Sequence, residues 1–377
     1  MIPYGRQSIN DADIAAVAEV LRGDWLTTGP VVSRFESAVA QLAGVEACVS
    51  VTSGTAALHC AYRAIGLGPG DEVITPPMTF VATQATAQLL GAEIVFADVE
   101  AGNGLIDPAK VAEKVTARTK AIVAVDYAGQ PADMDSLRAI ADECGAYLVE
   151  DAAHSIGAIS RGRPVGSLAD LTTFSFFPTK NLTTAEGGAV VGPDLELVER
   201  AREFHNHGLI RDPSRQDWPD EGPWHQEVAE FGLNYRLPDV LAALGLSQLE
   251  RLEEFRVKRQ AIVDAYSAAF SGVPGLDVLT LTPDSVPFWH IYPLRVHAEE
   301  RLRIFTELRR VGVGVQVNYL PAHLHPAFRR LGFGWGDFPV AEEFYRGEIS
   351  LPLYVDLPKD DVERVIDAVL KAASVGG

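Results

Sequence analysis

The segment from Phe174 to Ala189 contains a single basic residue, Lys180, among aromatic, hydroxyl and glycine residues. A lysine with few water neighbours has a lowered pKa, because burial disfavours the charged ammonium form. The neutral amine is a nucleophile, and it is the form that reacts with an aldehyde cofactor to give a Schiff base. Taken alone, the segment is more typical of a solvated lysine at a strand end, because most lysines are solvated.

Two further groups of polar residues favour the catalytic interpretation of Lys180. Residues 52–55, Thr-Ser-Gly-Thr, lie where an apolar run passes into a helical pattern, and the free N–H groups of a helix start favour a phosphate. An ordinary capped helix start explains the same residues. Asp151 follows another apolar run, and a buried carboxylate there could keep a pyridine nitrogen protonated. His154, three residues later, is by itself more typical of a structural histidine.

These residues need a scaffold, and the chain from residue 45 onwards alternates short β-rich runs with helical patterns. The runs are residues 47–51, 72–75, 94–97, 121–125 and 147–149. This alternation predicts an α/β domain with a mainly parallel sheet covered on both faces. Ligands of such sheets bind beyond the carboxyl ends of the strands, where residues 52–55 and Asp151 follow their runs.

Helical patterns also flank this region. Apolar residues at helical spacing predict amphipathic helices over 14–21 and 32–42, with residues 23–30 as the loop between them. Pro238 opens a long helical pattern that continues to Phe255. A chain of 377 residues is too long for one compact core, so we expect a large domain over 1–250 and a smaller one over 251–377.

Composition excludes several classes of partner. The net charge of −19, from 32 basic and 51 acidic residues, argues against nucleic acid or an anionic membrane as the partner. The three cysteines, Cys48, Cys60 and Cys144, are an odd number in apolar or helical contexts and suit free thiols in a reducing compartment. The first residues show no basic region followed by an apolar core, so we expect a cytoplasmic protein.

Metal and nicotinamide chemistry find less support in the sequence. The pairs His205/His207 and His323/His325 come without the carboxylate or thiol partners of a metal site, so we expect no metal. The glycines at 66–70 follow a helix and precede a strand, the reverse of a dinucleotide-binding fingerprint. This position argues against a nicotinamide-dependent oxidoreductase.

Taken together, the motifs of this chain resemble those of the DegT-type nucleotide-sugar aminotransferases. These enzymes use pyridoxal phosphate (PLP) and have the aspartate-aminotransferase fold, PLP fold type I, with a large mainly parallel sheet domain and a smaller C-terminal α+β domain. The similarity covers nearly the whole length and is carried by Trp25-Leu-Thr-Thr-Gly-Pro, Ser53-Gly-Thr, Gly70-Asp-Glu-Val-Ile-Thr-Pro, Phe80-Val-Ala-Thr, Glu150-Asp-Ala-Ala-His, Phe174-Ser-Phe, Lys180-Asn-Leu, Glu186-Gly-Gly, Asn234-Tyr-Arg-Leu, Gln316-Val-Asn-Tyr and Ser350-Leu-Pro.

The resemblance implies a role for each motif residue. Lys180 would be the Schiff-base lysine and Asp151 the partner of the pyridine nitrogen, with His154 near the phenolic oxygen. The remaining cofactor contacts implied are Phe80 on the ring and Ser53, Gly54, Thr55 and Ser175 around the phosphate. Asn234 is similar to the family asparagine that reaches the phosphate from the neighbouring subunit, which implies a homodimer with a shared active site.

The resemblance also implies the substrates, a nucleotide sugar and glutamate as the amino donor. The stretches similar to those that hold the nucleotide sugar comprise Tyr4, Asp24, Trp25, Leu26, Thr27, Gln316, Val317, Asn318 and Tyr319. The related sugar 3-dehydratases have histidine where Lys180 stands, so the lysine favours transamination.

Within the family, Ala185-Glu-Gly-Gly188 is more similar to the branch that aminates C4 of a 4-keto sugar than to the C3 branch. The chain most resembles transaminases that make UDP-4-amino-4,6-dideoxy-N-acetyl-β-L-altrosamine. It departs from them at Phe177 and Asn318, where those relatives have histidine near the substrate. A C3-aminating transaminase and a non-catalytic sensor of PLP or a sugar nucleotide are the alternatives.

Overall fold

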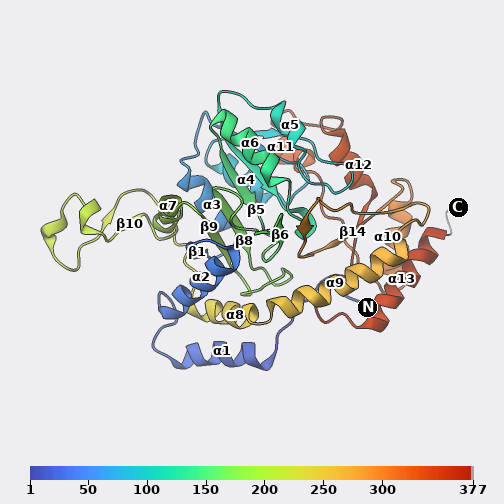
Figure 1. Cartoon of the computed structure of the whole chain (residues 1–377), viewed down its shortest axis with the longest axis horizontal. Helices are drawn as coiled ribbons and strands as arrows, with labels where there is room; N and C mark the ends of the chain where they lie inside the picture. The colour runs from blue at the N-terminus through green and yellow to red at the C-terminus, as the bar shows by residue number, and fades with distance from the viewer. Residues whose placement is uncertain (375–377) are drawn as a thin grey trace.

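The centre of the molecule is a seven-stranded sheet, seen in the computed structural model, which describes residues 1–374 (Figure 1). In spatial order its strands are β1 (Ala47–Val51), β9 (Gly188–Gly192), β8 (Leu171–Ser175), β5 (Tyr147–Asp151), β4 (Thr119–Val125), β2 (Glu72–Thr75) and β3 (Glu93–Phe96). Strand β9 runs antiparallel to both of its neighbours, and the other neighbouring pairs are parallel. The predicted α/β class with a large, mainly parallel sheet is confirmed.

Strand positions follow the apolar runs closely, because strands of a covered parallel sheet are buried on both faces. Residues 121–124 of β4, for example, are all fully buried. The expected strands 47–51 and 72–75 have the predicted bounds. The run at 147–149 continues to Asp151, and the one at 94–97 is displaced by one residue. The extension of β5 places Asp151 within the strand, at its carboxyl end.

Helices precede and connect these strands. They are α1 (Asp11–Arg22), α2 (Pro30–Ala43), α3 (Gly54–Ala64), α4 (Ala82–Leu89), α5 (Pro108–Ala112), α6 (Met134–Cys144) and α7 (Leu195–His205). Local sequence explains the ends of the first two. Asn10 and Asp13 form a reciprocal capping box at the start of α1. Helix α2 begins with Pro30 and is capped after Ala43 by Gly44, whose left-handed backbone (φ 69°) suits glycine.

The pattern after Pro238 forms two helices instead of the single long one expected. They are α8 (Asp239–Leu249) and α9 (Leu252–Phe270). Between them Arg251 leaves the helical conformation (φ −109°, ψ 6°), and its guanidinium lies 2.5 Å from the buried carboxylate of Asp13. The break therefore coincides with an ion pair that attaches this segment to α1.

A second, smaller sheet lies in the C-terminal part of the chain. It consists of β12 (Leu276–Val278), β14 (Tyr292–Val296) and β15 (Glu348–Leu351), all antiparallel. The accompanying helices are α10 (Arg301–Arg310), α11 (Pro326–Arg329), α12 (Pro339–Gly347) and α13 (Lys359–Ser374). The division into domains at residue 250 stays a prediction.

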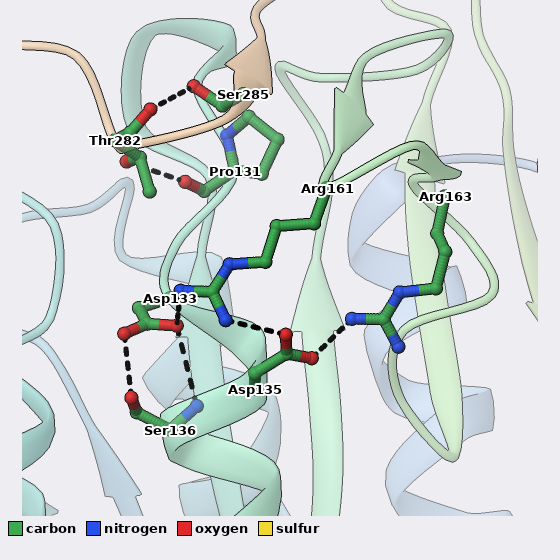
Figure 2. Close-up of polar contacts among 8 residues, drawn as sticks. All are labelled: Pro131, Asp133, Asp135, Ser136, Arg161, Arg163, Thr282 and Ser285. Atoms are coloured by element: carbon green, nitrogen blue, oxygen red, sulfur yellow. Dashed lines mark hydrogen bonds and ion pairs between the residues drawn. The ribbon is translucent and has the colours of Figure 1, made fainter.

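A small antiparallel sheet connects the two parts of the chain. Strand β13 (Ser285–Val286) pairs with β6 (Ile159–Ser160), which pairs with β7 (Arg163–Pro164). Figure 2 shows how the β6–β7 hairpin is held to the start of α6, where Asp135 accepts from Arg161 and Arg163. In the same view Thr282 donates to the carbonyl oxygen of Pro131 at 3.0 Å.

A long excursion from the body separates α7 from α8. It carries β10 (Leu209–Ile210) and β11 (Glu227–Val228), which pair with each other, and it extends far to the left in Figure 1. Its side chains include large exposed apolar groups, at Trp218, Trp224 and Phe231. We call residues 207–234 the arm.

We predict that Arg259 in α9 is a major contributor to stability. The side chain is 2% exposed and donates to the carbonyl oxygens of Trp289, His290 and Leu353 at 3.2–3.4 Å. Arg259→Met leaves buried carbonyls without donors and should lower the free energy of unfolding by about 3 kcal/mol. Arg161→Met, which removes only solvent-exposed ion pairs, should change the free energy of unfolding far less. Equal shifts of the urea midpoint in the two variants would contradict this ranking.

Candidate active site

A cavity of about 490 Å³ lies at the carboxyl ends of strands β4, β5 and β8 and at the start of α3. This volume lies in the range of pockets that bind cofactors and small substrates. Most of the residues selected from the sequence line it: Tyr4, Ser53, Gly54, Thr55, Phe80, Asp151, His154, Ser175, Lys180, Asn318 and Tyr319. The sheet therefore brings together residues from separate motifs, as expected for a parallel sheet.

Lys180 projects from the loop that follows β8. Its backbone N–H donates to the carbonyl oxygen of Phe177 at 2.9 Å. The next residue, Asn181, is buried and donates from its amide to the carbonyl oxygens of His154 and Phe288, at 2.9 and 2.7 Å. Burial lowers the pKa of Lys180 to about 8, although the nearby Asp151 carboxylate raises it. A substantial fraction of the amine is therefore neutral near pH 8.

Asp151 ends β5 and is 5% exposed. Its carboxylate accepts from the hydroxyl of Thr83 at 2.6 Å and from the N–H of Ala153 at 3.2 Å. Burial raises the pKa of Asp151, while these two hydrogen bonds and the charge of Lys180 lower it. The carboxylate is thus held in place by donors while one side of it faces the cavity.

Two buried imidazoles lie beside this pair. The rings of His154 and His290 have centroids 4.4 Å apart, and His154 Nε2 lies 3.3 Å from the hydroxyl of Tyr319. Burial and the charge of Lys180 lower the pKa of both histidines well below the usual value. Both rings are therefore neutral at physiological pH.

The start of α3 provides a site for an anion. The first N–H groups of a helix have no partner within it, and the Ser53 side chain occupies only that of Ala56, at 3.1 Å. A Cβ atom added to Gly54 would lie 2.8 Å from the Cβ of Ser175, so only glycine fits against that strand. The helix dipole and the hydroxyls of Thr55 and Ser175 favour a bound phosphate here.

Some of the residues selected from the sequence do not line the cavity of the single chain. Asp24, Trp25, Leu26 and Thr27 form an exposed loop, and Asn234 is exposed at the base of the arm. Gln316 and Val317 precede the lining residues Asn318 and Tyr319 but do not contribute to the cavity wall. Their roles stay predictions, and those of the first loop and Asn234 would require a second subunit.

Conversely, sequence reasoning missed three residues at the site. Tyr127 is the second residue after β4, so the rule of inspecting strand ends could have found it. His290 stands two residues before β14, far along the chain from the other residues, and no motif marked it. Thr83 belongs to the Phe80-Val-Ala-Thr motif, but only the structure shows its hydroxyl on Asp151.

Over residues 1–374, no group of three or more His, Cys, Asp or Glu side chains is arranged to hold a metal ion. Within the same range, none of the helices has the length and apolar character needed to cross a membrane.

Comparison with known proteins identifies the family. The model of the DegT/DnrJ/EryC1/StrS aminotransferase family matches residues 7–370. The chain is also 40% identical over 374 residues to the spore coat polysaccharide biosynthesis protein SpsC of Bacillus subtilis, covering 98% of this chain and 96% of SpsC. The chain therefore belongs to the DegT/DnrJ/EryC1/StrS aminotransferase family.

Solved structures agree with this assignment. The PMP form of Spr1654 from Streptococcus pneumoniae, a protein assigned as a sugar aminotransferase, matches with a TM-score of 0.94 at 31% identity, over 100% of both chains. Helicobacter pylori PseC, an aminotransferase involved in the biosynthesis of pseudoaminic acid, matches with a TM-score of 0.93 at 32% identity, over 99% of both chains. Spr1654 is also solved in a PLP form. The family is PLP-dependent, and the chain is an aminotransferase of the sugar-aminating type.

The residues of the cavity fit PLP. Asp151 is a buried carboxylate, Lys180 a buried amine with a lowered pKa, and Gly54 allows close approach to the open start of α3. Phe80, 58% exposed, presents an aromatic face at the cavity wall and lies 6.1 Å from Tyr319 between ring centroids. Amine, carboxylate, anion site and aromatic surface are the four features that the cofactor needs.

We predict that Asp151→Asn lowers the pKa of Lys180 below 8 in the cofactor-free protein. The aspartate charge raises the pKa of Lys180, so its removal leaves burial unopposed. The pH dependence of Lys180 modification by an amine-reactive reagent, quantified by peptide mass spectrometry, measures this change. Asp126→Asn removes another buried carboxyl group without that effect and should leave the midpoint near 8. A midpoint that rises or stays in Asp151→Asn would refute the coupling.

Proposed function

We propose that the protein transfers an amino group from glutamate to the C4 keto carbon of a nucleotide-linked keto-deoxy sugar. The observation that carries this proposal is the convergence, in one cavity, of the buried amine of Lys180, the buried carboxylate of Asp151 and the open N-terminus of α3. PLP, when bound, supplies the aldehyde that takes up the amino group and the ring that accepts the electrons of the substrate carbanion.

The residues of the chain divide the work of holding the cofactor. Asp151, fixed by Thr83, would keep the pyridine nitrogen protonated, and His154 would lie near the phenolic oxygen. Phe80 would cover one face of the ring. The phosphate would bind at Gly54 and Thr55, with the side chains of Ser53 and Ser175 nearby.

Lys180 has two tasks in this proposal. Its amine would hold the cofactor through the aldehyde at rest, and once displaced by the amine of glutamate it would take a proton from the glutamate α-carbon and deliver it to the cofactor. A pKa of about 8 suits both tasks, because the neutral amine is accessible and the ammonium form can return the proton. The keto sugar then receives its amino group by the same steps in reverse, so one lysine serves both half-reactions.

The sugar would occupy the side of the cavity formed by Tyr4, Asn318 and Tyr319. The names of two relatives support a sugar substrate of this class, since SpsC is a polysaccharide biosynthesis protein and PseC takes part in pseudoaminic acid biosynthesis. Ala185-Glu-Gly-Gly188 supports the C4 position. Phe177, which lines the cavity, replaces a histidine of the altrosamine-type relatives and would change the contacts to the sugar.

A homodimer in the cytoplasm completes the proposal. Asn234 lies at the base of the arm, which carries exposed apolar groups at Trp218, Trp224 and Phe231. Apolar side chains gathered on a projecting segment are typical of a surface that another chain covers. Asn234 and the exposed loop 24–27 would then contact the cavity of the partner subunit.

The proposed reaction predicts PLP-dependent consumption of nucleotide-linked 4-keto-6-deoxy sugars with glutamate as donor. The purified holoenzyme is incubated with a series of such sugars, and the products are analysed by NMR, which distinguishes an amino group at C4 from one at C3. Lys180→Ala should lower the rate by about four orders of magnitude or more, because it removes nucleophile and base together. Amination at C3 would contradict the position, and bound PLP without turnover of any sugar would indicate a sensor.

The shared site predicts complementation between the inactive variant Lys180→Ala and the impaired variant Asn234→Ala. Lys180→Ala and Asn234→Ala, mixed under conditions of subunit exchange, form heterodimers in which one of the two sites has both residues intact. Random exchange makes half of the dimers heterodimers, so activity should recover to about a quarter of the wild-type value. Mixing Lys180→Ala with Asp151→Asn is the control, because both changes lie on the same side of the site. The control mixture should stay inactive, because it would regain an intact site only if Asp151 came from the partner subunit. Recovery of activity in the control mixture would therefore contradict the arrangement. Absence of recovery in the mixture with Asn234→Ala would contradict it as well.

A further inference from the structure

Behind the sugar side of the cavity lies a buried carboxyl group that the proposed mechanism does not use. Glu348, the first residue of β15, is fully buried and does not belong to the cavity wall. Its carboxyl group accepts from the backbone N–H of Asn318 at 2.7 Å and from the hydroxyl of Ser350. Glu348 is therefore attached directly to one of the residues that face the cavity.

A chain of hydrogen bonds connects Glu348 to Tyr4. The Ser350 hydroxyl, having donated to Glu348, accepts from Asn318 Nδ2 at 3.0 Å. The same amide nitrogen donates its second hydrogen to the hydroxyl oxygen of Tyr4 at 2.5 Å. Tyr127 holds this segment from the other side by donating to the carbonyl oxygen of Asn318.

The direction of this chain decides what Tyr4 offers to a ligand. The Tyr4 oxygen accepts from Asn318 and also lies within hydrogen-bonding reach of the Ser350 hydroxyl, whose own hydrogen goes to Glu348. The O–H hydrogen of Tyr4 is therefore not needed for the contact with Asn318 and can be donated to a ligand in the cavity. Tyr4 lines the cavity. We propose that Glu348 is a positioning residue whose carboxylate orders this chain, so that Tyr4 donates a hydrogen bond to an acceptor oxygen of the sugar substrate, a phosphate or keto oxygen. This inference rests on the proposed function for the identity of the ligand.

When Glu348 is protonated, the hydrogen bonds of this chain must be donated in the opposite direction, from Glu348 toward Ser350. The backbone N–H of Asn318 can only donate, so one carboxyl oxygen must accept from it and the proton must reside on the oxygen facing Ser350. Ser350 then donates to Asn318, whose amide turns its oxygen toward Ser350 and Tyr4. Tyr4 donates to that oxygen and presents only lone pairs to the cavity.

Burial raises the pKa of Glu348 to about 8, while Ser350, Asn318 and the charge of Arg301 lower it. The other groups facing it are the phenols of Tyr4, Tyr127 and Tyr319. Burial raises the pKa of each phenol, so all three stay neutral in this range. Arg295, opposite Glu348 on β14, extends to the carbonyl oxygen of Ala101 and to Asp277. The direction of the chain should thus change between pH 7 and 9.

Glu348→Gln separates this effect from other titrations. The glutamine amide donates toward Ser350 at every pH, so the variant keeps the reversed direction permanently. At pH 9 its KM for the sugar should exceed the wild-type KM by about tenfold, the effect of losing one hydrogen bond to a charged or strongly polar acceptor. At pH 6.5 the two KM values should coincide, because wild-type Glu348 is then protonated. The ratio of the variant KM to the wild-type KM at each pH removes the contribution of Lys180, because Lys180 titrates equally in both proteins.

Three further variants control the experiment. Glu36→Gln is the control, since Glu36 is a buried carboxylate away from the cavity that accepts from the N–H and the hydroxyl of Ser50 and also pairs with Arg202. The ratio of its KM to the wild-type KM should stay near one at both pH values. Tyr4→Phe should raise KM at pH 9 as Glu348→Gln does, and the double variant should show no further increase. Ser350→Ala interrupts the chain should Glu348→Gln not fold, and should abolish the pH dependence of the ratio.

The proposal would be overturned if the ratio of the Glu348→Gln KM to the wild-type KM did not depend on pH. It would also be overturned if the increases in KM caused by Tyr4→Phe and Glu348→Gln were additive in the double variant. Neutron crystal structures at pH 6.5 and 9 test the chain without a substrate, because they locate the hydrogens on Ser350, Asn318 and Tyr4. If the wild type converts no nucleotide sugar, the proposed function fails, yet these maps still decide the direction. Identical hydrogen positions at the two pH values would refute the role of Glu348.

Discussion

A buried amine and a buried carboxylate share one cavity, and each controls the charge of the other. Removal from water lowers the pKa of Lys180 and raises that of Asp151, whereas their mutual attraction acts against both shifts. The result is an amine that titrates near 8 beside a carboxylate that Thr83 and Ala153 help to keep charged. A more solvated site would leave the lysine protonated, and a drier one would neutralise both groups.

The sheet provides the means of burying these groups without losing their orientation. Successive residues of a strand point to opposite faces, so Glu150 and Asp151 of one motif have different environments. Glu150 accepts from the hydroxyl of Thr172 and the N–H of Gly166, which belong to the interior, while Asp151 faces the cavity. One carboxylate of the pair is therefore structural, and only the other is available to a ligand.

Sequence reasoning located the elements whose signal is local. Apolar runs mark the strands β1 and β2, and polar residues after such runs mark the start of α3 and Asp151. The lysine segment is marked by its single basic residue. Contacts between distant segments left no such trace. The hydroxyl of Thr83 on Asp151 spans 68 residues, and the break at Arg251 coincides with an ion pair to Asp13, 238 residues away. Propensity and periodicity carry no information on these pairs, because tertiary contacts determine them.

The two sides of the cavity also differ in how they are built, which bears on the departure at Asn318. The side proposed for the cofactor consists of strand ends, whereas on the side proposed for the sugar Tyr4 and Asn318 are joined through hydrogen bonds to β15. An amide nitrogen carries two hydrogens and donates to Tyr4 and Ser350 at once, which the single N–H of an imidazole nitrogen cannot do. The asparagine at 318, where the resemblance led us to expect histidine, therefore matches Tyr4, Ser350 and Glu348 as a set. A change of sugar specificity in this chain would accordingly involve the four residues together and not Asn318 alone.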